Sequence, residues 1–220
     1  MRYFPVFLDL KEKACVVVGG GRVAERKVRN LLRAGARVKV ISPELTAPLC
    51  RLRREGKIAH LARPYRRKDL RGAFLAMAAT DDRGVNERVF REATEEGIPV
   101  NVVDDPAHSS FIVPSIVEKK DLLVAVSTSG RSPALARLIR EKLEREIGPE
   151  YPRLLDLLGK VREKVLPLGL GQRKNQKIFR RLLGEDLAAL VREKKGRELD
   201  RRLLRVLGPG FTRKDLGFRW

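Results

Sequence analysis

The stretch from Cys15 to Lys27, with the sequence CVVVGGGRVAERK, constrains the fold of this chain more than any other part. An apolar, β-branched run leads directly into three glycines, and Val23, Val28 and Leu31 then follow with helical spacing. A strand, a tight turn and a helix in this order open a dinucleotide-binding βαβ unit. The stretch therefore predicts a nucleotide-binding site, and the simpler interpretation is a glycine turn that binds nothing.

The small residues of this turn have separate expected roles. Gly19 permits the tight turn, Gly21 allows a pyrophosphate to approach the backbone, and Ala24 lets the helix pack closely on the strand. The free N–H groups and the dipole at the start of the helix favour bound phosphate. Arg22, at that start, either contacts a phosphate or is simply solvated.

The first half of the chain alternates strands with helices of about a dozen residues, which indicates a Rossmann-like α/β fold with a doubly wound parallel sheet. Residues 3–10 are predicted to form an extended arm that includes Pro5 and covers the core as an edge segment. The expected strands are residues 14–18, 37–41, 57–61, 74–79 and 100–103, and the expected helices are residues 23–34, 46–55 and 86–96.

Ligands of such a sheet bind outside the carboxyl ends of its strands. By this rule, the segments that follow four of the strands are expected to lie around one cleft. An Asp or Glu usually ends the second strand and binds the ribose 2′-OH of NAD. Here Ser42 or Glu44 must serve, so these residues do not decide between NAD and NADP. The predicted cofactor-binding residues are Gly19, Gly20, Gly21, Arg22, Val23, Ser42, Pro43, Glu44, Thr80, Asp81 and Asn101.

The pattern changes after residue 110. Residues 111–117 and 122–126 are predicted to form a hairpin, and a helix is expected from residue 134 to about 147. Ser132 is suited to cap this helix and Pro133 to begin it. Capping explains Ser132 but not the other hydroxyl groups of the preceding loop. That loop is a second candidate for anion binding, through Ser127, Thr128, Ser129 and Arg131.

From residue 151 onward the chain is predicted to be helical and strongly basic. Residues 151–220 hold 19 Lys and Arg against 8 Asp and Glu, so +11 of the total net charge of +20 lies there. Short helices are expected at residues 178–183, 187–191 and 199–207, and the tail after residue 207 is expected to be loose.

The excess of positive charge has three possible explanations. A surface rich in Arg, Lys and Glu is typical of thermophilic proteins but does not by itself supply an excess. Nucleic-acid binding would supply it, although the sequence has no zinc knuckle, aromatic RNA-binding motif or basic heptad arm. A polyanionic substrate or a phosphate-bearing cofactor would also favour a positive field.

Targeting and metal signals are weak in this sequence. No secretory leader is seen at the N-terminus, and no apolar run approaches the roughly 20 residues that cross a bilayer. We therefore expect a cytoplasmic protein without a membrane partner. The two histidines and two cysteines do not have the spacing of a metal site, so no metal ligands are predicted.

Several motifs together closely resemble those of the precorrin-2 dehydrogenase family, the dehydrogenase/ferrochelatase module of siroheme synthase. The resemblance is strong over about residues 1–145 and weaker in the helical remainder. The motifs that carry it occur in the family's order and are Pro5–Leu10, Val16–Ala24, Ala78–Asp82, Asn101–Asp104 and Ser127–Pro133.

The resemblance implies NAD-dependent oxidation of precorrin-2 to sirohydrochlorin, and in some members also iron insertion that gives siroheme. It implies a homodimer and three parts: an NAD-binding domain at residues 1–112, a small α+β dimerisation unit at 113–149, and a basic helical domain at 150–220. The additional methyltransferase domain of the fused members is not expected in this chain. A substrate that carries eight carboxylates would suit a basic cleft.

By the same resemblance Asp104 is the catalytic acid/base, which removes a substrate proton while hydride leaves to NAD. The simpler interpretation is that Asp104 only caps the turn at Asp105 and Pro106. Asp105 is an adjacent rival for the acid/base role, and His108 is more typical of a loop or surface position. Ser129 stands where relatives often carry glycine, so this loop departs from the family's pattern at that position.

A function of another class remains open at this point. The chain could be an NAD-binding, redox-responsive regulator whose basic tail contacts nucleic acid. The excess charge of residues 151–220 motivates this alternative. The tail lacks a convincing helix-turn-helix with a polar recognition face, so nucleic acid is not an expected partner.

Overall fold

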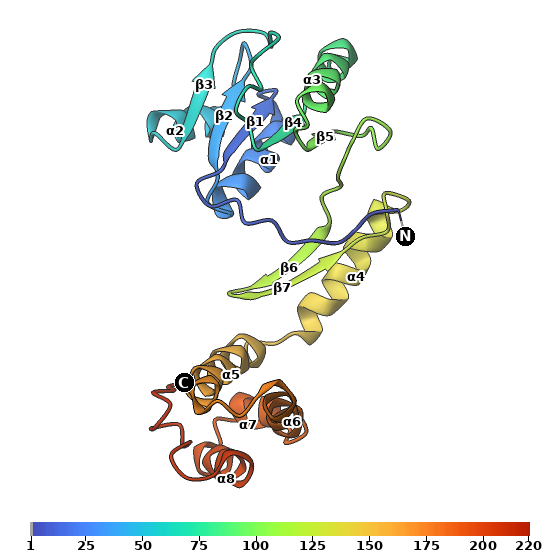
Figure 1. Cartoon of the computed structure of the whole chain (residues 1–220). Helices are drawn as coiled ribbons and strands as arrows, with labels where there is room; N and C mark the ends of the chain where they lie inside the picture. Colours follow the sequence, from blue (N-terminus) through green and yellow to red (C-terminus); the bar gives the residue numbers. More distant parts are fainter. Residues whose placement is uncertain (1) are drawn as a thin grey trace. The chain divides into compact units, whose positions relative to one another are not determined.

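The computed structural model describes residues 2–220 and divides the chain into two compact units (Figure 1). Unit 1 extends to Val113 and includes Ser129–Arg131, and unit 2 comprises Pro114–Thr128 and Ser132–Trp220. The predicted boundary between residues 149 and 150, within unit 2, stays a prediction.

Unit 1 contains a five-stranded parallel sheet in the order β3-β2-β1-β4-β5. This order confirms the predicted doubly wound α/β fold. The strands are β1 (Ala14–Val18), β2 (Arg37–Ile41), β3 (Ile58–Leu61), β4 (Leu75–Ala78) and β5 (Val100–Val102), and the helices are α1 (Arg22–Arg33), α2 (Ala47–Arg54) and α3 (Arg83–Glu95).

Each face of this sheet has its own apolar core, because successive side chains of a strand point to opposite faces. In β1, Cys15 and Val17 pack with side chains of α1 and α2, whereas Val16 and Val18 pack with side chains of α3. Figure 1 shows the helices of unit 1 around the sheet. All four residues of β4 are buried, as expected for a parallel strand that is covered on both faces.

Unit 2 begins with an antiparallel hairpin and continues as helices. Its apolar core lies among the helices that follow α4 and includes Leu157, Val161, Leu199 and Leu203, all fully buried. The elements are β6 (Ser115–Lys119), β7 (Leu122–Val126), α4 (Pro133–Glu146), α5 (Glu150–Val165), the 3₁₀ helix η1 (Leu166–Leu168), α6 (Gln172–Leu183), α7 (Leu187–Arg192) and α8 (Gly196–Leu207).

One expectation about the chain ends stays a prediction and one was wrong. Residues 4–10 are irregular, and Leu10 packs against the core of unit 1, whereas Phe4 and Phe7 are 79% and 70% exposed, so the arm covers the core only at its end. The tail after α8 is not loose, because Phe211 and Phe218 are buried in the core of unit 2. Short apolar stretches do not reveal which core they join.

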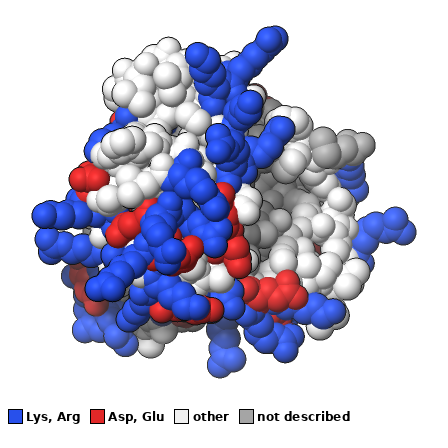
Figure 2. Space-filling view, turned by 90° about the horizontal axis from the view of Figure 1, so that it is seen from below, with Lys and Arg blue, Asp and Glu red and all other residues white. Residues whose placement is uncertain are grey.

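The positive charge of unit 2 is distributed among acidic residues rather than gathered in one uniform patch. Figure 2 shows Lys and Arg side chains across the face that it views, with Asp and Glu among them. Arg202 contacts both Glu185 and Glu198, and Arg213 contacts Asp200. Such networks are typical of a highly charged surface. In residues 2–220 we find no helix with the length and apolar character that a membrane span requires.

Candidate functional site

The glycine turn between β1 and α1 is closely surrounded by backbone on one side. A Cβ on Gly19 would lie 2.2 Å from the carbonyl oxygen of Ala79, and one on Gly20 would lie 1.9 Å from that of Glu44. Gly19 also has a φ of +123°, a backbone conformation that residues with a side chain rarely adopt. These two glycines therefore let the loops after β2 and β4 approach the turn.

Gly21 has a different environment. A Cβ on Gly21 would meet no atom within 4 Å, so this position faces open space. Gly21 is also the N-cap of α1, and no side chain caps this helix. The N–H groups of its first turn are thus available to an anion, which the helix dipole also favours. Ala24 is fully buried beneath the turn, as its predicted packing role requires.

The loop after β2 is held against α1 by Thr46. The backbone N–H of Thr46 donates to the Gly20 carbonyl at 3.0 Å, and its hydroxyl donates to the Glu25 carboxylate at 3.0 Å. The Ser42 carbonyl accepts from Nε2 of His60 at 2.9 Å. Pro43 and Glu44 are exposed next to the turn. Glu44 is therefore the acidic residue of this loop that is exposed beside the turn, where a ribose could accept or donate hydrogen bonds.

The loop after β4 is fixed by Asn86, a buried residue of α3 that the sequence interpretation missed. Its amide donates to the Thr80 carbonyl at 2.9 Å and accepts from the Thr80 hydroxyl at 2.9 Å. Asp81 and Asp82 are both exposed, and Asp82 caps α3 by accepting from the N–H of Val85. A polar residue on the inward face of a helix is the signal that could have identified Asn86.

Asn101, in β5, is buried, and both the oxygen and the nitrogen of its side-chain amide are hydrogen-bonded within unit 1. Its Oδ1 accepts from Nζ of Lys27 at 2.6 Å, and its Nδ2 donates to the Phe111 carbonyl at 3.1 Å. A cofactor would therefore meet an amide that already has two partners. The predicted contact of Asn101 with the cofactor stays a prediction.

Two adjacent aspartates follow β5 and differ in their partners. The Asp105 carboxylate accepts from the N–H groups of Ala107 and His108 and from Nδ1 of His108 at 2.7 Å. The hydrogen bond from His108 holds the pKa of Asp105 below its usual value. Asp105, rather than Asp104, thus caps the turn, and the ring of His108 packs edge-to-face on Phe90.

Asp104 is exposed and has a φ of +58°. Within the described chain, residues 2–220, its carboxylate has no hydrogen bond or ion pair. A non-glycine residue in this conformation costs free energy and is often found at functional sites. Asp104 is therefore the carboxylate at this strand end that is available to a ligand.

The serine-rich loop before α4 uses several of its hydroxyl groups internally. The Thr128 hydroxyl accepts from the N–H of Ser132 at 3.1 Å and donates to the carbonyl of Ser132 at 2.9 Å. Ser132 caps α4 by accepting from the N–H of Leu135 at 3.2 Å. Ser129 has a φ of +54°, a conformation that favours glycine. The substrate contacts predicted for Ser127, Thr128, Ser129 and Arg131 stay predictions.

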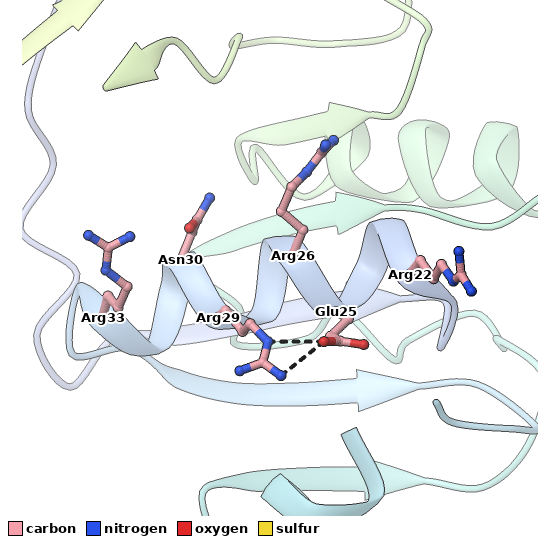
Figure 3. Close-up of a pocket in the computed structure, with 6 residues that line it drawn as sticks. All are labelled: Arg22, Glu25, Arg26, Arg29, Asn30 and Arg33. Atoms are coloured by element: carbon pink, nitrogen blue, oxygen red, sulfur yellow. Dashed lines mark hydrogen bonds and ion pairs between the residues drawn. The ribbon is translucent and has the colours of Figure 1, made fainter. Parts of the chain in front are cut away.

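A row of arginines follows α1 away from its N-terminus. Figure 3 shows Arg26, Asn30 and Arg33 on one side of the helix, while Arg29 turns toward Glu25 on the other. Arg29 and Glu25 form an ion pair at 2.9 Å. Together with Arg22 these residues line a hollow of about 510 Å³. The basic residues give this part of unit 1 a positive field beside the turn.

Over residues 2–220, no three His, Cys, Asp or Glu side chains gather in a way that could hold a metal ion. The expectation that the chain has no metal ligands stays a prediction.

Comparison with known proteins identifies the first unit. Residues 6–115 match the family described as putative NAD(P)-binding. The chain belongs to this family. Residues 120–146 match a second family, described as the central part of a sirohaem biosynthesis protein. The prediction of a nicotinamide dinucleotide as cofactor is thereby confirmed.

Curated relatives with high similarity include siroheme synthases. That of Methylobacillus flagellatus is 45% identical over 191 residues, which cover 85% of this chain and 41% of the relative. That of Actinobacillus succinogenes is 48% identical over 165 residues, or 75% of this chain and 35% of the relative. The chain thus spans about two fifths of the length of these relatives or less.

The solved structure of SirC, a precorrin-2 dehydrogenase, is similar over nearly its whole length. The match has a TM-score of 0.74 and 25% identity, and it covers 91% of this chain and 98% of the other. The resemblance inferred from the sequence motifs is confirmed by these comparisons.

Proposed function

We propose that this chain oxidises precorrin-2 to sirohydrochlorin with NAD as the oxidant. The observation that carries the proposal is the unpaired Asp104 carboxylate at the end of β5, in the same unit as the open glycine turn that suits a dinucleotide. The name of the structural neighbour supports the substrate, and the names of the curated relatives support the pathway step.

The proposed reaction removes two electrons and two protons from the substrate. Bound NAD would supply the acceptor for a hydride from a substrate carbon, with NADH as the reduced product. The Asp104 carboxylate accepts the proton that leaves the macrocycle and then releases it to water. The N–H groups at the start of α1 would hold the pyrophosphate, and the open space at Gly21 would let it approach.

The charge of the protein supports an anionic tetrapyrrole as substrate. Precorrin-2 carries carboxylates around its periphery, and the chain has a net charge of +20. A positive field raises both the affinity for such a substrate and the rate of encounter. We include Ser127, Thr128, Ser129 and Arg131 in the proposed substrate site.

The preference for NAD over NADP is part of the proposal. Glu44 follows β2 closely and is exposed beside the glycine turn, where a carboxylate would accept a hydrogen bond from the ribose 2′-OH. The same negative charge would repel the 2′-phosphate of NADP. Glu44→Gln is expected to reduce the ratio of NAD to NADP affinity.

We further propose that the protein is a cytoplasmic homodimer in which unit 2 supplies contact surface. The apolar side chains of Ile116 and Leu123 on the hairpin, and of Leu135 and Leu138 on α4, are exposed. Exposed apolar side chains of this size are common at protein interfaces. Sedimentation analysis of the full chain would test the dimer.

Iron insertion into sirohydrochlorin is a second candidate function. The same free carboxylate of Asp104 favours it, because the reaction requires a base for the pyrrole protons while the metal ion enters as a substrate. The measurement is incorporation of Fe²⁺ or Co²⁺ into sirohydrochlorin, compared with the uncatalysed rate. Equal rates would exclude chelatase activity and leave the oxidation unaffected.

The oxidation itself is tested by adding the purified chain to precorrin-2 under anaerobic conditions, with NAD in one series and NADP in another. We expect NADH and the sirohydrochlorin spectrum to appear together and in equal amounts, and faster with NAD. Loss of precorrin-2 without a nucleotide requirement would contradict the proposal.

A further inference from the structure

Lys27 places an ammonium group on the β5 side of α1. Its side chain is partly buried, and Nζ donates to Oδ1 of Asn101 at 2.6 Å. The Asn101 amide is itself oriented by the Phe111 carbonyl, which accepts from Nδ2 at 3.1 Å. Lys27 is therefore held in a defined position by a buried partner from another element.

The charge of Lys27 is poorly compensated. Within residues 2–220 the ammonium makes this one hydrogen bond, to a neutral amide, and it has no ion pair. Burial, followed by repulsion from Arg26, lowers the pKa of Lys27, while the negative charge of Asp104 acts in the opposite direction. A partly desolvated ammonium with unused N–H donors is stabilised when an anion binds to it.

We propose that the Lys27 ammonium binds a carboxylate of the tetrapyrrole substrate and so holds the macrocycle beside Asp104. The proposal rests on the proposed function for the identity of the substrate. Lys27 is a binding and positioning residue in this account, and Asp104 remains the group that exchanges protons with the substrate.

A substrate carboxylate suits this site better than a phosphate of the cofactor. Lys27 lies five residues beyond Arg22, so it is about 7 to 8 Å further along the axis of α1. The pyrophosphate already has the N–H groups of the first helical turn and the open space at Gly21. Lys27 faces Asn101, on the strand whose end precedes Asp104.

The test is a titration of the full chain with sirohydrochlorin, and separately with NAD, under anaerobic conditions. The variants are Lys27→Met and Lys27→Arg, with Lys57→Met as a control. Lys57 is an exposed lysine of unit 1 that pairs with Glu55, so this control removes the same charge away from the site. Lys27→Gln retains a donor for Asn101 and replaces Lys27→Met if that variant does not fold.

We expect Lys27→Met to weaken sirohydrochlorin binding about 10- to 100-fold, which is the range for losing a hydrogen bond to a charged group. Lys27→Arg should recover most of the affinity, and Lys57→Met should bind as the wild type does. Affinity for NAD should be unchanged in all variants. With precorrin-2 as substrate, Lys27→Met should raise KM more than it lowers kcat.

Unchanged sirohydrochlorin affinity in both Lys27→Met and Lys27→Gln would overturn the proposal. Weaker NAD binding with normal sirohydrochlorin binding would identify a cofactor phosphate as the anion and would also overturn it. A wild-type chain that binds sirohydrochlorin through Lys27 but forms no NADH from precorrin-2 would refute the proposed oxidation and leave the carboxylate site in place.

Discussion

The glycine turn at residues 19–21 and the serine-rich loop at residues 127–132 both lead directly into a helix, and both are predicted to bind anions. The helix after the glycine turn has no side-chain cap, and Gly21 faces open space. The helix after the serine-rich loop is capped by Ser132, and the Thr128 hydroxyl is bonded within the loop. A loop rich in hydroxyl groups can thus satisfy its own donors, whereas glycines leave backbone N–H groups to a ligand.

The largest effect is expected from Gly20→Ala. The added methyl group would lie 1.9 Å from the Glu44 carbonyl oxygen, so backbone must move. We expect a loss of about 3 kcal/mol or more in the free energy of unfolding, measured by denaturant titration, because strain of this kind belongs to the large-effect class of mutations. A stable, fully folded variant would show that the turn does not need this close approach.

Gly21→Ala is the matched substitution in the same turn. A methyl group here meets no protein atom, so stability should fall by no more than about 1 kcal/mol, the typical cost of alanine at an N-cap. Calorimetric titration should show NAD affinity reduced about tenfold or more, or about 1.4 kcal/mol, because the methyl group occupies the space of the pyrophosphate. Normal NAD affinity in this variant would argue that the cofactor does not approach the turn at Gly21.

How far the sequence could predict the site depends on how far apart along the chain the contacting residues lie. The turn and its flanking strand and helix follow from residues that are neighbours in the chain, and the prediction of the fold class is confirmed. The contact between Lys27 and Asn101 joins residues 74 positions apart. No local pattern contains such a contact, and the same holds for the burial of Phe218 in the core of unit 2.

The two aspartates after β5 show a further limit of sequence interpretation. Asp104 and Asp105 are the same residue type at adjacent positions, so the sequence alone does not decide which of them caps the turn and which is available for catalysis. The backbone decides between them, because it turns the Asp105 carboxylate toward His108 and two N–H groups. Asp104 adopts a positive φ and is left without a partner in the part of the chain that the structure describes.

In the serine-rich loop, Ser132→Ala should cost about 1 kcal/mol of stability, which is typical for the loss of an N-cap. The hydrogen bond from Leu135 N–H would be lost. Thermal unfolding should show the loss, and Ser132→Asp, which can also cap a helix, should restore most of it. NAD affinity should not change, because the N–H donors that we assign to the cofactor are those of α1.

The smallest effect is expected from a comparison of Ser129→Gly with Ser129→Ala. Both variants lack the hydroxyl, so they differ in how well they tolerate the φ of +54°. The glycine variant should be more stable than the alanine variant by up to about 1 kcal/mol. Equal stabilities would mean that the loop does not hold this conformation.

The central claim is that Asp104 removes the proton while the glycine turn holds the oxidant. It is tested most directly by a single turnover of precorrin-2 with NAD, comparing wild type, Asp104→Asn and Asp105→Asn. We predict that Asp104→Asn binds NAD normally but forms NADH about 100-fold more slowly or worse, as expected for loss of a general base. Asp105→Asn should lose stability in its turn and retain most of the rate. Wild-type rates of NADH formation in Asp104→Asn would contradict the account.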